Sequence, residues 1–222
     1  MSKINYLLIL SIFLGLTSFA TSNKSDDERE DKKIEVSSEV LPNSSRILWK
    51  GFKPMGEHTG EIKIKSGNLL FVDTLLTGGE IVVDMSSITC TDIEEVEKNA
   101  KLISHLKSAD FFDVDSFNTA TLVIKKTIPY GAFETKQEES TGQVYKAIAD
   151  LTIKEITKEI KFQLKLYQYN DGNGYVSASS RIEIDRSDFD VKYGSGSFFE
   201  ELGDKIIYDE FRLDISISSR LK

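Results

Sequence analysis

Hydrophobic and polar residues alternate along most of this chain. In the segment 160–166 the even-numbered residues are apolar and the odd-numbered ones polar, whereas in 211–217 the odd-numbered residues are apolar. Ile81, Val83 and Met85 lie on one side of a further alternating segment. A period of two is typical of antiparallel strands that bury one face and expose the other to water.

This alternation predicts about eight strands, over 46–52, 60–75, 79–88, 119–129, 142–153, 157–169, 174–185 and 206–218. Turn residues punctuate them: the pair Gly78 and Gly79, and the segment 171–174, whose Asp-Gly-Asn-Gly sequence is typical of a hairpin. Closing eight such strands into a barrel removes every exposed sheet edge. We therefore expect an all-β fold with one or two short helices, built as an antiparallel eight-stranded β-barrel.

One helix is expected between the third and fourth predicted strands. The segment 91–94 (Thr-Asp-Ile-Glu) fits a capping box, in which two side chains satisfy the free amides of the first helical turn. Apolar residues then recur at helical spacing: Ile93, Val96, Ala100, Ile103 and Leu106. This apolar stripe predicts that the helix lies against the sheet or across an open end of the barrel.

The interior of such a barrel is either filled by side chains or holds one small ligand. The strand 175–180 (Tyr-Val-Ser-Ala-Ser-Ser) has small side chains on both faces. Small inward residues leave space for a ligand, but they also allow a strand to pack tightly under a helix. Both interpretations stay open at this point.

The first 20 residues have the pattern of a secretory signal peptide. Lys3 supplies the positive start, an apolar run follows over 6–16, and Ser18 and Ala20 are the small residues of a cleavage site. The run is too short for a stable transmembrane helix. We expect residues 1–20 to be removed and the mature protein to be periplasmic or secreted, without stable membrane insertion.

Residues 21–44 are rich in charge and offer little to bury, so a disordered tether is expected there, followed by one domain over 45–222. The chain has 28 Lys and Arg against 36 Asp and Glu, a formal charge of −8. Nucleic acid and an anionic membrane surface are therefore not expected as partners, because phosphate binding needs clustered cations. Cys90 is the only cysteine, so no intramolecular disulfide is possible, and a buried thiol is favoured over a reactive one.

The chain has two histidines, and each lies in a distinctive phrase. His58 is the centre of 56–60 (Gly-Glu-His-Thr-Gly), and His105 opens 105–114, which contains two adjacent phenylalanines. A metal site needs three or four donors, and a hydrolase needs a nucleophile beside its base. The sequence indicates neither, so no metal, no cofactor and no catalytic residue is expected. Each histidine is expected to pin a turn by a hydrogen bond or to meet a ligand head group at a pocket mouth.

Four blocks of sequence, taken in order, resemble one family. They are 45–51 (Ser-Arg-Ile-Leu-Trp-Lys-Gly) with 56–60, then 78–88, then 102–114, and finally 151–158 with 184–189 (Ile-Asp-Arg-Ser-Asp-Phe). In this order they resemble the YceI-like family of exported proteins that bind lipids or polyisoprenoids, over about residues 45–218. Asn118 stands where the family often has proline, and Ala149, Glu155 and Asp190 stand where glycine is common.

The resemblance implies a lipocalin-like barrel with a long apolar pocket for an amphiphile, an isoprenoid chain or a fatty-acid derivative. Burying one methylene is worth about 0.8 kcal/mol, so a long chain in a preformed tunnel needs few polar contacts. The candidate wall residues are Trp49, Ile62, Ile64, Ile81, Val83, Phe162, Leu164, Phe211 and Leu213. Most of these could instead simply be part of the core, and that role is favoured for each.

Five further residues complete the candidate site: Phe111 and Phe112 after the helix, and the polar His58, His105 and Arg186. One phenylalanine is expected to pack inward and the other to cover the helix or the mouth. Arg186 either meets a carboxylate or phosphate head group or forms an Arg–Asp pair at the barrel rim. We expect a monomer or homodimer that binds, transports or sequesters an amphipathic lipid without catalysis. The alternatives are a filled barrel that acts as a protein-interaction module, and a lipid-acting enzyme.

Overall fold

The computed structural model describes residues 33–133, 140–169, 173–200 and 202–222. The expected signal peptide, the first part of the expected tether and the first two residues of the glycine-rich hairpin at 171–174 lie outside the described residues. No helix in the described ranges is long and apolar enough to cross a membrane.

Nine strands form one antiparallel sheet in the described part of the chain. They are β1 (Glu35–Val40), β2 (Arg46–Lys53), β3 (Gly56–Val72), β4 (Leu75–Cys90), β5 (Thr119–Phe133), β6 (Ser140–Ile153), β7 (Ile156–Tyr169), β8 (Tyr175–Asp185) and β9 (Glu210–Leu221). The eight predicted strands correspond in order to β2–β9. Some strand ends lie up to four residues from the predicted ones; β9, for example, begins at Glu210 because the residues before it form a separate loop.

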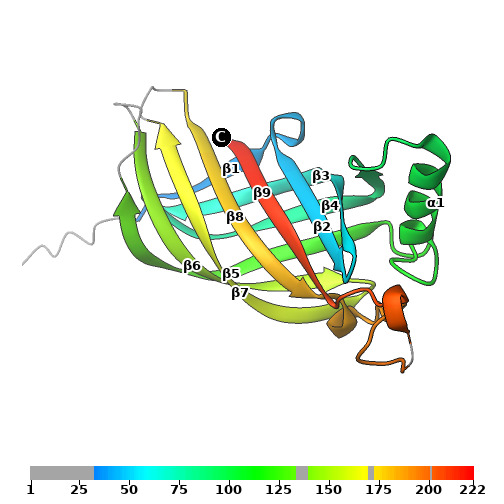
Figure 1. Cartoon of the computed structure of the whole chain (residues 1–222). Coiled ribbons are helices and arrows are strands. Elements are labelled where there is room, and N and C mark those ends of the chain that lie inside the picture. The colour runs from blue at the N-terminus through cyan, green and yellow to red at the C-terminus, as the bar shows by residue number, and fades with distance from the viewer. Residues whose placement is uncertain (1–32, 134–139, 170–172, 201) are drawn as a thin grey trace, which may run out of the picture. The chain divides into compact units, whose positions relative to one another are not determined.

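The sheet closes on itself because β3 pairs with β4, which gives an eight-stranded barrel of β2–β9 and confirms the predicted architecture (Figure 1). β1 occupies the same position as β2, between β3 and β9, but further along both strands. A single turn of 3-10 helix, η1 (Pro42–Ser44), separates β1 from β2. The two strands therefore act as one interrupted strand of the barrel wall.

The boundary predicted for the tether is wrong, because β1 belongs to the barrel and not to a disordered segment. The sequence of β1 is short and polar, so its alternation carries no hydrophobic signal. Ser38 is nevertheless fully buried, and its hydroxyl donates to Ser219 Oγ at 3.0 Å. Burial of a serine is stable only with such a partner, which the sequence of β1 alone does not reveal.

The helix α1 (Val96–Lys107) begins later than predicted, and the expected capping box does not form. Glu95 is the residue before the helix and makes no side-chain cap bond. Thr91 instead donates its backbone N–H to Thr59 O at 2.9 Å, and the Asp92 carboxylate accepts from Thr59 N at 2.7 Å. The Thr91 hydroxyl also donates to Thr59 O at 3.3 Å, so both side chains contact β3 and are not available to cap the helix.

The buried side of α1 also differs from the predicted stripe. Val96 is 80% exposed and Ala100 is exposed, whereas Leu106 is buried and Leu102 and Ile103 are half-buried. Asn99 lies on the inward side, and its amide donates to the carbonyl oxygens of Cys90 and Ile93 at 3.0 and 2.9 Å. A polar anchor therefore helps to set the rotation of the helix.

The pair Gly78 and Gly79 lies inside β4 and does not form the predicted turn. Gly79 has a φ of 153°, and a Cβ there would lie 2.5 Å from Asn68 O. Glycine is needed at this point because β3 and β4 approach closely, and the turn between them lies at 73–74, where Asp73 adopts a left-handed conformation with φ 56°.

Two positions that depart from the family pattern have the backbone conformation that favours glycine. Glu155, between β6 and β7, has a φ of 62°, and Asp190, after η2 (Arg186–Phe189), has a φ of 58°. Ala149 is different, because it is fully buried within β6 and its φ is not positive. The turns are therefore kept without glycine, at a small conformational cost.

The barrel interior contains two clusters of buried residues, one toward each end. The far cluster consists of Leu69, Phe71, Leu76, Ile124, Tyr145, Ala147, Ala149, Leu164, Leu166 and Val176. The helix-end cluster includes residues of α1 and of the strand ends near it, such as Ile62, Met85, Leu106, Phe111 and Ile184. Figure 1 shows α1, η2 and η3 (Gly203–Lys205) beyond the same end of the barrel.

Candidate functional site

A cavity of about 300 Å³ lies inside the helix end of the barrel. Its wall is built by inward residues of β2–β6, β8 and β9, by α1 and by the segments after α1 and before β9. None of the buried residues of the far cluster lines it. The cavity therefore occupies only part of the length of the barrel.

Ten of the fourteen predicted site residues line this cavity: Trp49, His58, Ile62, Val83, His105, Phe111, Phe112, Arg186, Phe211 and Leu213. They come from six separate parts of the chain, and the closed sheet brings them together. That they contact a ligand stays a prediction.

The other four predicted residues do not line the cavity. Ile64 and Ile81 are buried in the helix-end cluster, Leu164 belongs to the far cluster, and Phe162 packs against both clusters. Alternation identifies the inward face of a strand, but it does not show how far along the barrel a residue lies. For that reason alternation did not separate these four from the residues that line the cavity, and that they contact a ligand stays a prediction.

Fourteen lining residues were not among the candidates: Ile47, Gly51, Phe52, Lys53, Met85, Ile88, Leu102, Leu106, Ala120, Leu151, Ile153, Ile184, Ile207 and Tyr208. Most of the apolar ones share the alternating inward faces that selected the candidates, so that signal was present in the sequence. Lys53 and Tyr208 follow no hydrophobic pattern, and only the folded structure places them at the cavity.

One wall of the cavity is fixed by the single tryptophan. Trp49 Nε1 donates to Thr89 O at 2.9 Å, which ties the ring of a β2 residue to β4 across β3. A Cβ at Gly60 on β3 would lie 2.6 Å from Trp49 Cζ2 and 1.7 Å from Thr89 O. Only glycine allows this close approach. The tryptophan of β2 and the glycine of the 56–60 segment therefore depend on each other.

Aromatic rings form the helix-side wall. Phe111 is buried and Phe112 is half-buried, and their ring centroids are 5.5 Å apart. His105 packs edge-on against Phe111 at 5.4 Å and against Tyr193 at 4.4 Å. Both phenylalanines line the cavity, so neither has only the covering role that was expected for one of them.

His58 joins the start of β3 to the segment that follows β4. Its Nδ1 lies 2.8 Å from Asp92 Oδ2, and Asp92 Oδ1 also accepts from Cys90 Sγ at 3.3 Å. Burial alone would raise the pKa of Asp92, but the hydrogen bonds from Thr59 N–H and from His58 outweigh it and hold that pKa below its ordinary value. Burial raises the pKa of the Cys90 thiol, which favours the neutral form that a structural thiol has.

The polar part of the lining carries positive or neutral side chains. Lys53 Nζ lies 3.3 Å from His58 Nε2, and in the described part of the chain no carboxylate is within ion-pairing distance of Lys53. Among the described residues that line the cavity, none is Asp or Glu. This arrangement favours an acidic group over a basic one at the rim.

Arg186 is 3% exposed and is held by the loop before β9. Its guanidinium donates to the carbonyl oxygens of Val191, Ile207 and Tyr208 at 2.7, 3.0 and 3.2 Å, and Nη2 lies 3.2 Å from Asp209 Oδ1. The pair is therefore the Arg–Asp lock that was one of the two interpretations, with Asp209 as the acid. The neighbouring Asp185 instead accepts from Ser187 N and caps η2.

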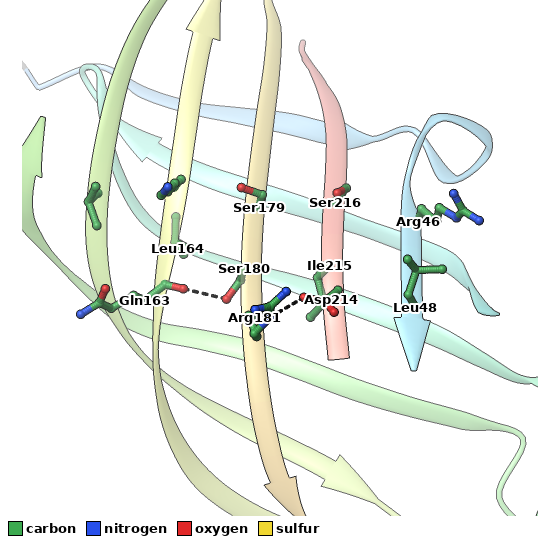
Figure 2. Close-up of a pocket in the computed structure, with 12 residues that line it drawn as sticks. Arg46, Leu48, Gln163, Leu164, Ser179, Ser180, Arg181, Asp214, Ile215 and Ser216 are labelled. Carbon is green, nitrogen blue, oxygen red and sulfur yellow. Dashed lines mark hydrogen bonds and ion pairs between the residues drawn. The ribbon is translucent and has the colours of Figure 1, made fainter. Parts of the chain in front are cut away.

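A second hollow, of about 470 Å³, lies on the outer face of the barrel across β6–β9 and β2. Figure 2 shows Ser179 and Ser216 in it, with Arg181 paired to Asp214 and Ser180 bonded to the Gln163 carbonyl. Of the small residues noted in the strand 175–180, Ser179 and Ser180 line this hollow, whereas Ala178 packs against both clusters of the interior. The charged, serine-rich lining of the hollow cannot withdraw an apolar chain from water, so the inner cavity is the candidate site.

The described residues contain no group of three or more His, Cys, Asp or Glu side chains that could hold a metal ion. His58 Nε2 faces Lys53, and the thiol of Cys90 contacts Asp92 and not the imidazole. Nucleophilic catalysis needs the nucleophile against the base, and this cluster does not have that arrangement. What the site offers chemically is an apolar enclosure with a cationic rim.

The fold is shared with solved structures of low sequence identity. A polyisoprenoid binding domain from Saccharophagus degradans superposes with a TM-score of 0.62 at 12% identity, over 84% of this chain and 99% of that chain. BcnA from Burkholderia cenocepacia superposes with a TM-score of 0.54 at 16% identity, over 81% of this chain and 98% of that chain. At such identities the likeness establishes the fold alone.

No curated relative matches the chain by sequence. The model of one family, the YceI-like domain, matches residues 39–219. The match covers β2–β8, all but the last two residues of β9, and every residue that lines the cavity. The chain therefore belongs to the YceI-like family.

Proposed function

We propose that this protein binds an amphipathic lipid, such as a polyisoprenoid or a fatty-acid derivative, and transports or sequesters it in the periplasm or outside the cell. The observation that carries the proposal is the apolar cavity of about 300 Å³ inside a closed barrel. The family supports lipid binding in general, and one structural neighbour is itself a polyisoprenoid binding domain. The signal peptide expected at 1–20 supports export.

The volume of the cavity limits how much of a chain it encloses. If a methylene takes roughly the ~30 Å³ that a water molecule occupies in the liquid, about ten carbons fit. At about 0.8 kcal/mol for each methylene, their burial supplies about 8 kcal/mol before the costs of association. The proposal is therefore that a chain of about ten carbons is enclosed and that a longer chain extends beyond the mouth.

Lys53 and His58 supply the head-group end of the proposed site. Lys53 has its ammonium beside the imidazole, with no carboxylate partner among the described residues, and both residues line the cavity. An acidic head group, a carboxylate or a phosphate, would complete this pair by a charge-assisted hydrogen bond. Arg186 is not the proposed contact, because its own hydrogen bonds already hold it to the loop.

The test uses the single tryptophan as a reporter. Trp49 lines the cavity, so its fluorescence in the delipidated protein should change saturably when dodecanoate or farnesyl phosphate is added. Replacing the cavity residue Ala120 by phenylalanine should raise the Kd at least about tenfold, since the new ring occupies the space of the chain. The matched control is Val123→Phe, on the outward face of the same strand, which should bind as the wild type does.

The head-group assignment has its own comparison. Lys53→Met should weaken dodecanoate binding while leaving dodecanol binding nearly unchanged, because only the acid uses the cation. Binding that is equal in wild type, Ala120→Phe and Val123→Phe would contradict the cavity as the site. A folded protein that takes up none of these amphiphiles would favour the protein-interaction module instead.

A further inference from the structure

The helix end of the barrel exposes aromatic side chains on the segment between β8 and β9. Phe198 and Phe199 are adjacent in this segment and are 49% and 48% exposed. Tyr193 and Tyr208, on the same segment, are about equally exposed. These four residues are called the aromatic patch below.

The aromatic patch is held in place by buried polar contacts. Ser195 is fully buried, and its hydroxyl donates to Asp209 Oδ2 at 2.8 Å. Its carbonyl oxygen accepts from the backbone N–H groups of Phe198 and Phe199 at 3.3 and 3.0 Å. Ile207 also donates its N–H to Gly194 O, which pairs the two sides of the loop. The rings are therefore presented by an anchored turn.

Two residues of the aromatic patch, Tyr193 and Tyr208, join it to the wall of the cavity. Tyr208 is exposed and also lines the cavity, and its N–H donates to Phe52 O at the end of β2. Tyr193 packs against His105, another lining residue, at 4.4 Å. A molecule that leaves the cavity past these rings would meet whatever covers the aromatic patch.

The size and chemistry of the aromatic patch fit a lipid surface. Half-exposed aromatic side chains of this kind present roughly 300–500 Å² in total, as much as the largest apolar patch of a typical monomer. Aromatic rings with a polar edge partition favourably into the head-group region of a bilayer. Charges of both signs lie on the segment between β8 and β9: Lys192 Nζ lies 4.9 Å from the Phe198 ring centroid and pairs with Asp190, and Glu200 and Lys205 follow in the sequence. Such a surface gains little from anionic lipid and suits a zwitterionic one.

We propose that the aromatic patch docks the protein reversibly on the surface of a zwitterionic bilayer, with the mouth of the cavity toward the lipid. The rings would enter the head-group region, and the amphiphile would pass between bilayer and cavity without crossing water. Docking is separate from cargo binding, because it uses the exposed rings and needs no occupied cavity.

The test measures flotation of the mature protein with phosphatidylcholine vesicles. The double variant Phe198→Ser with Phe199→Ser should lower the partition coefficient at least about tenfold, because the two half-exposed rings supply much of the apolar area. Binding of the wild type should be nearly unchanged between low and high salt, since screening weakens only charge attraction. The matched control is Ile128→Ser with Tyr130→Ser, a pair of exposed residues on β5 beyond the far cluster, which should bind vesicles as the wild type does.

Equal vesicle binding by the wild type and the Phe198/Phe199 variant would overturn the proposal. So would binding that requires anionic lipid and is lost in high salt, or a dimer in solution that the same variant dissociates. Dodecanoate uptake, followed by Trp49 fluorescence, should be unchanged in this variant. Lost uptake with intact vesicle binding would count against the cavity and not against docking, so the two proposals fail separately.

Discussion

The two ends of the barrel are built from the same alternating strands, yet one end is filled and the other is hollow. In the far cluster Tyr145, Leu76 and Leu166 are each 1% exposed, and the Tyr145 hydroxyl accepts from Leu76 N at 3.3 Å. At the helix end small residues face the interior. A Cβ on Gly51 would meet no atom within 4 Å, and Ala120 lines the cavity. Alternation therefore shows which side chains of a strand point inward. It does not show whether they contact side chains from the opposite wall of the barrel.

The difference begins where β7 and β8 separate. They are paired only from Leu164 with Ser180 to Gln168 with Val176, and toward the helix end they are no longer bonded to each other (Figure 1). The turn η2 lies beside β7 here, with Lys158 Nζ 3.4 Å from Asp188 Oδ1, and its last residue, Phe189, is buried. A barrel that opens on one side and is sealed by a loop and a helix keeps a wider interior at that end.

The largest expected effect comes from the loop that seals the hollow end. Asp209→Ala removes the carboxylate partner of Arg186 and leaves a buried charge unpaired, so the free energy of unfolding should fall by about 3–5 kcal/mol. Chemical denaturation measures this change, and cargo binding should weaken with it because Arg186 and Ile207 line the cavity. Asp214→Ala is the control, since Asp214 pairs with the exposed Arg181 and should cost about 1 kcal/mol or less. Similar losses of unfolding free energy in both variants would contradict a larger contribution from the buried Arg186–Asp209 pair.

A sharper test makes the same substitution at both ends. Ala147→Leu in the far cluster must displace packed neighbours and should destabilise the protein by about 1–3 kcal/mol. Ala120→Leu extends into empty space, so its effect on stability should be close to zero. Thermal unfolding of the two variants, compared with the wild type, measures the contrast. Equal destabilisation would mean that the cavity is filled in solution by side-chain rearrangement.

The smallest expected effect concerns the acid that holds His58 at the mouth. The pKa of Asp92 is below its ordinary value of 3.8, so the folded state binds a proton less readily than the unfolded state. Its contribution is therefore present above that ordinary value and is lost as the pH falls through the lowered one. Asp92→Asn should cost about 1 kcal/mol or less near neutral pH, and the difference from the wild type should shrink toward about pH 3. Urea denaturation at both pH values measures it, and a difference that grows in acid would contradict the assignment.

How much of the molecule was predictable differs between its parts. The eight strands β2–β9 were predicted in order because each carries enough alternating apolar residues to show its buried face. β1 was missed because its buried Ser38 depends on Ser219, a partner 181 residues away. The start of α1 was wrong because Thr91 and Asp92 are bonded to Thr59 and not to the helix. In both cases the structure is determined by a hydrogen bond between residues distant in the sequence, which a local sequence pattern cannot reveal.

The candidate site shows the same division. The rare residues His58, His105 and Trp49 were identified from the sequence, and the fold brings all of them to the cavity. Phe162 and Leu164 were predicted with equal reason and lie deeper in the barrel. Lys53 was not predicted at all, because a lysine at the end of a strand looks like any solvated side chain until the mouth forms around it.

The sequence by itself determined the barrel and the face of each strand that is buried, because side-chain direction along a strand is a local property with a period of two. Only the tertiary structure decided that one end is hollow. Whether opposing side chains meet depends on how far the strands separate and on which loop covers the gap. Both follow from pairings between residues distant in the chain, such as β3 with β4 and Arg186 with Asp209.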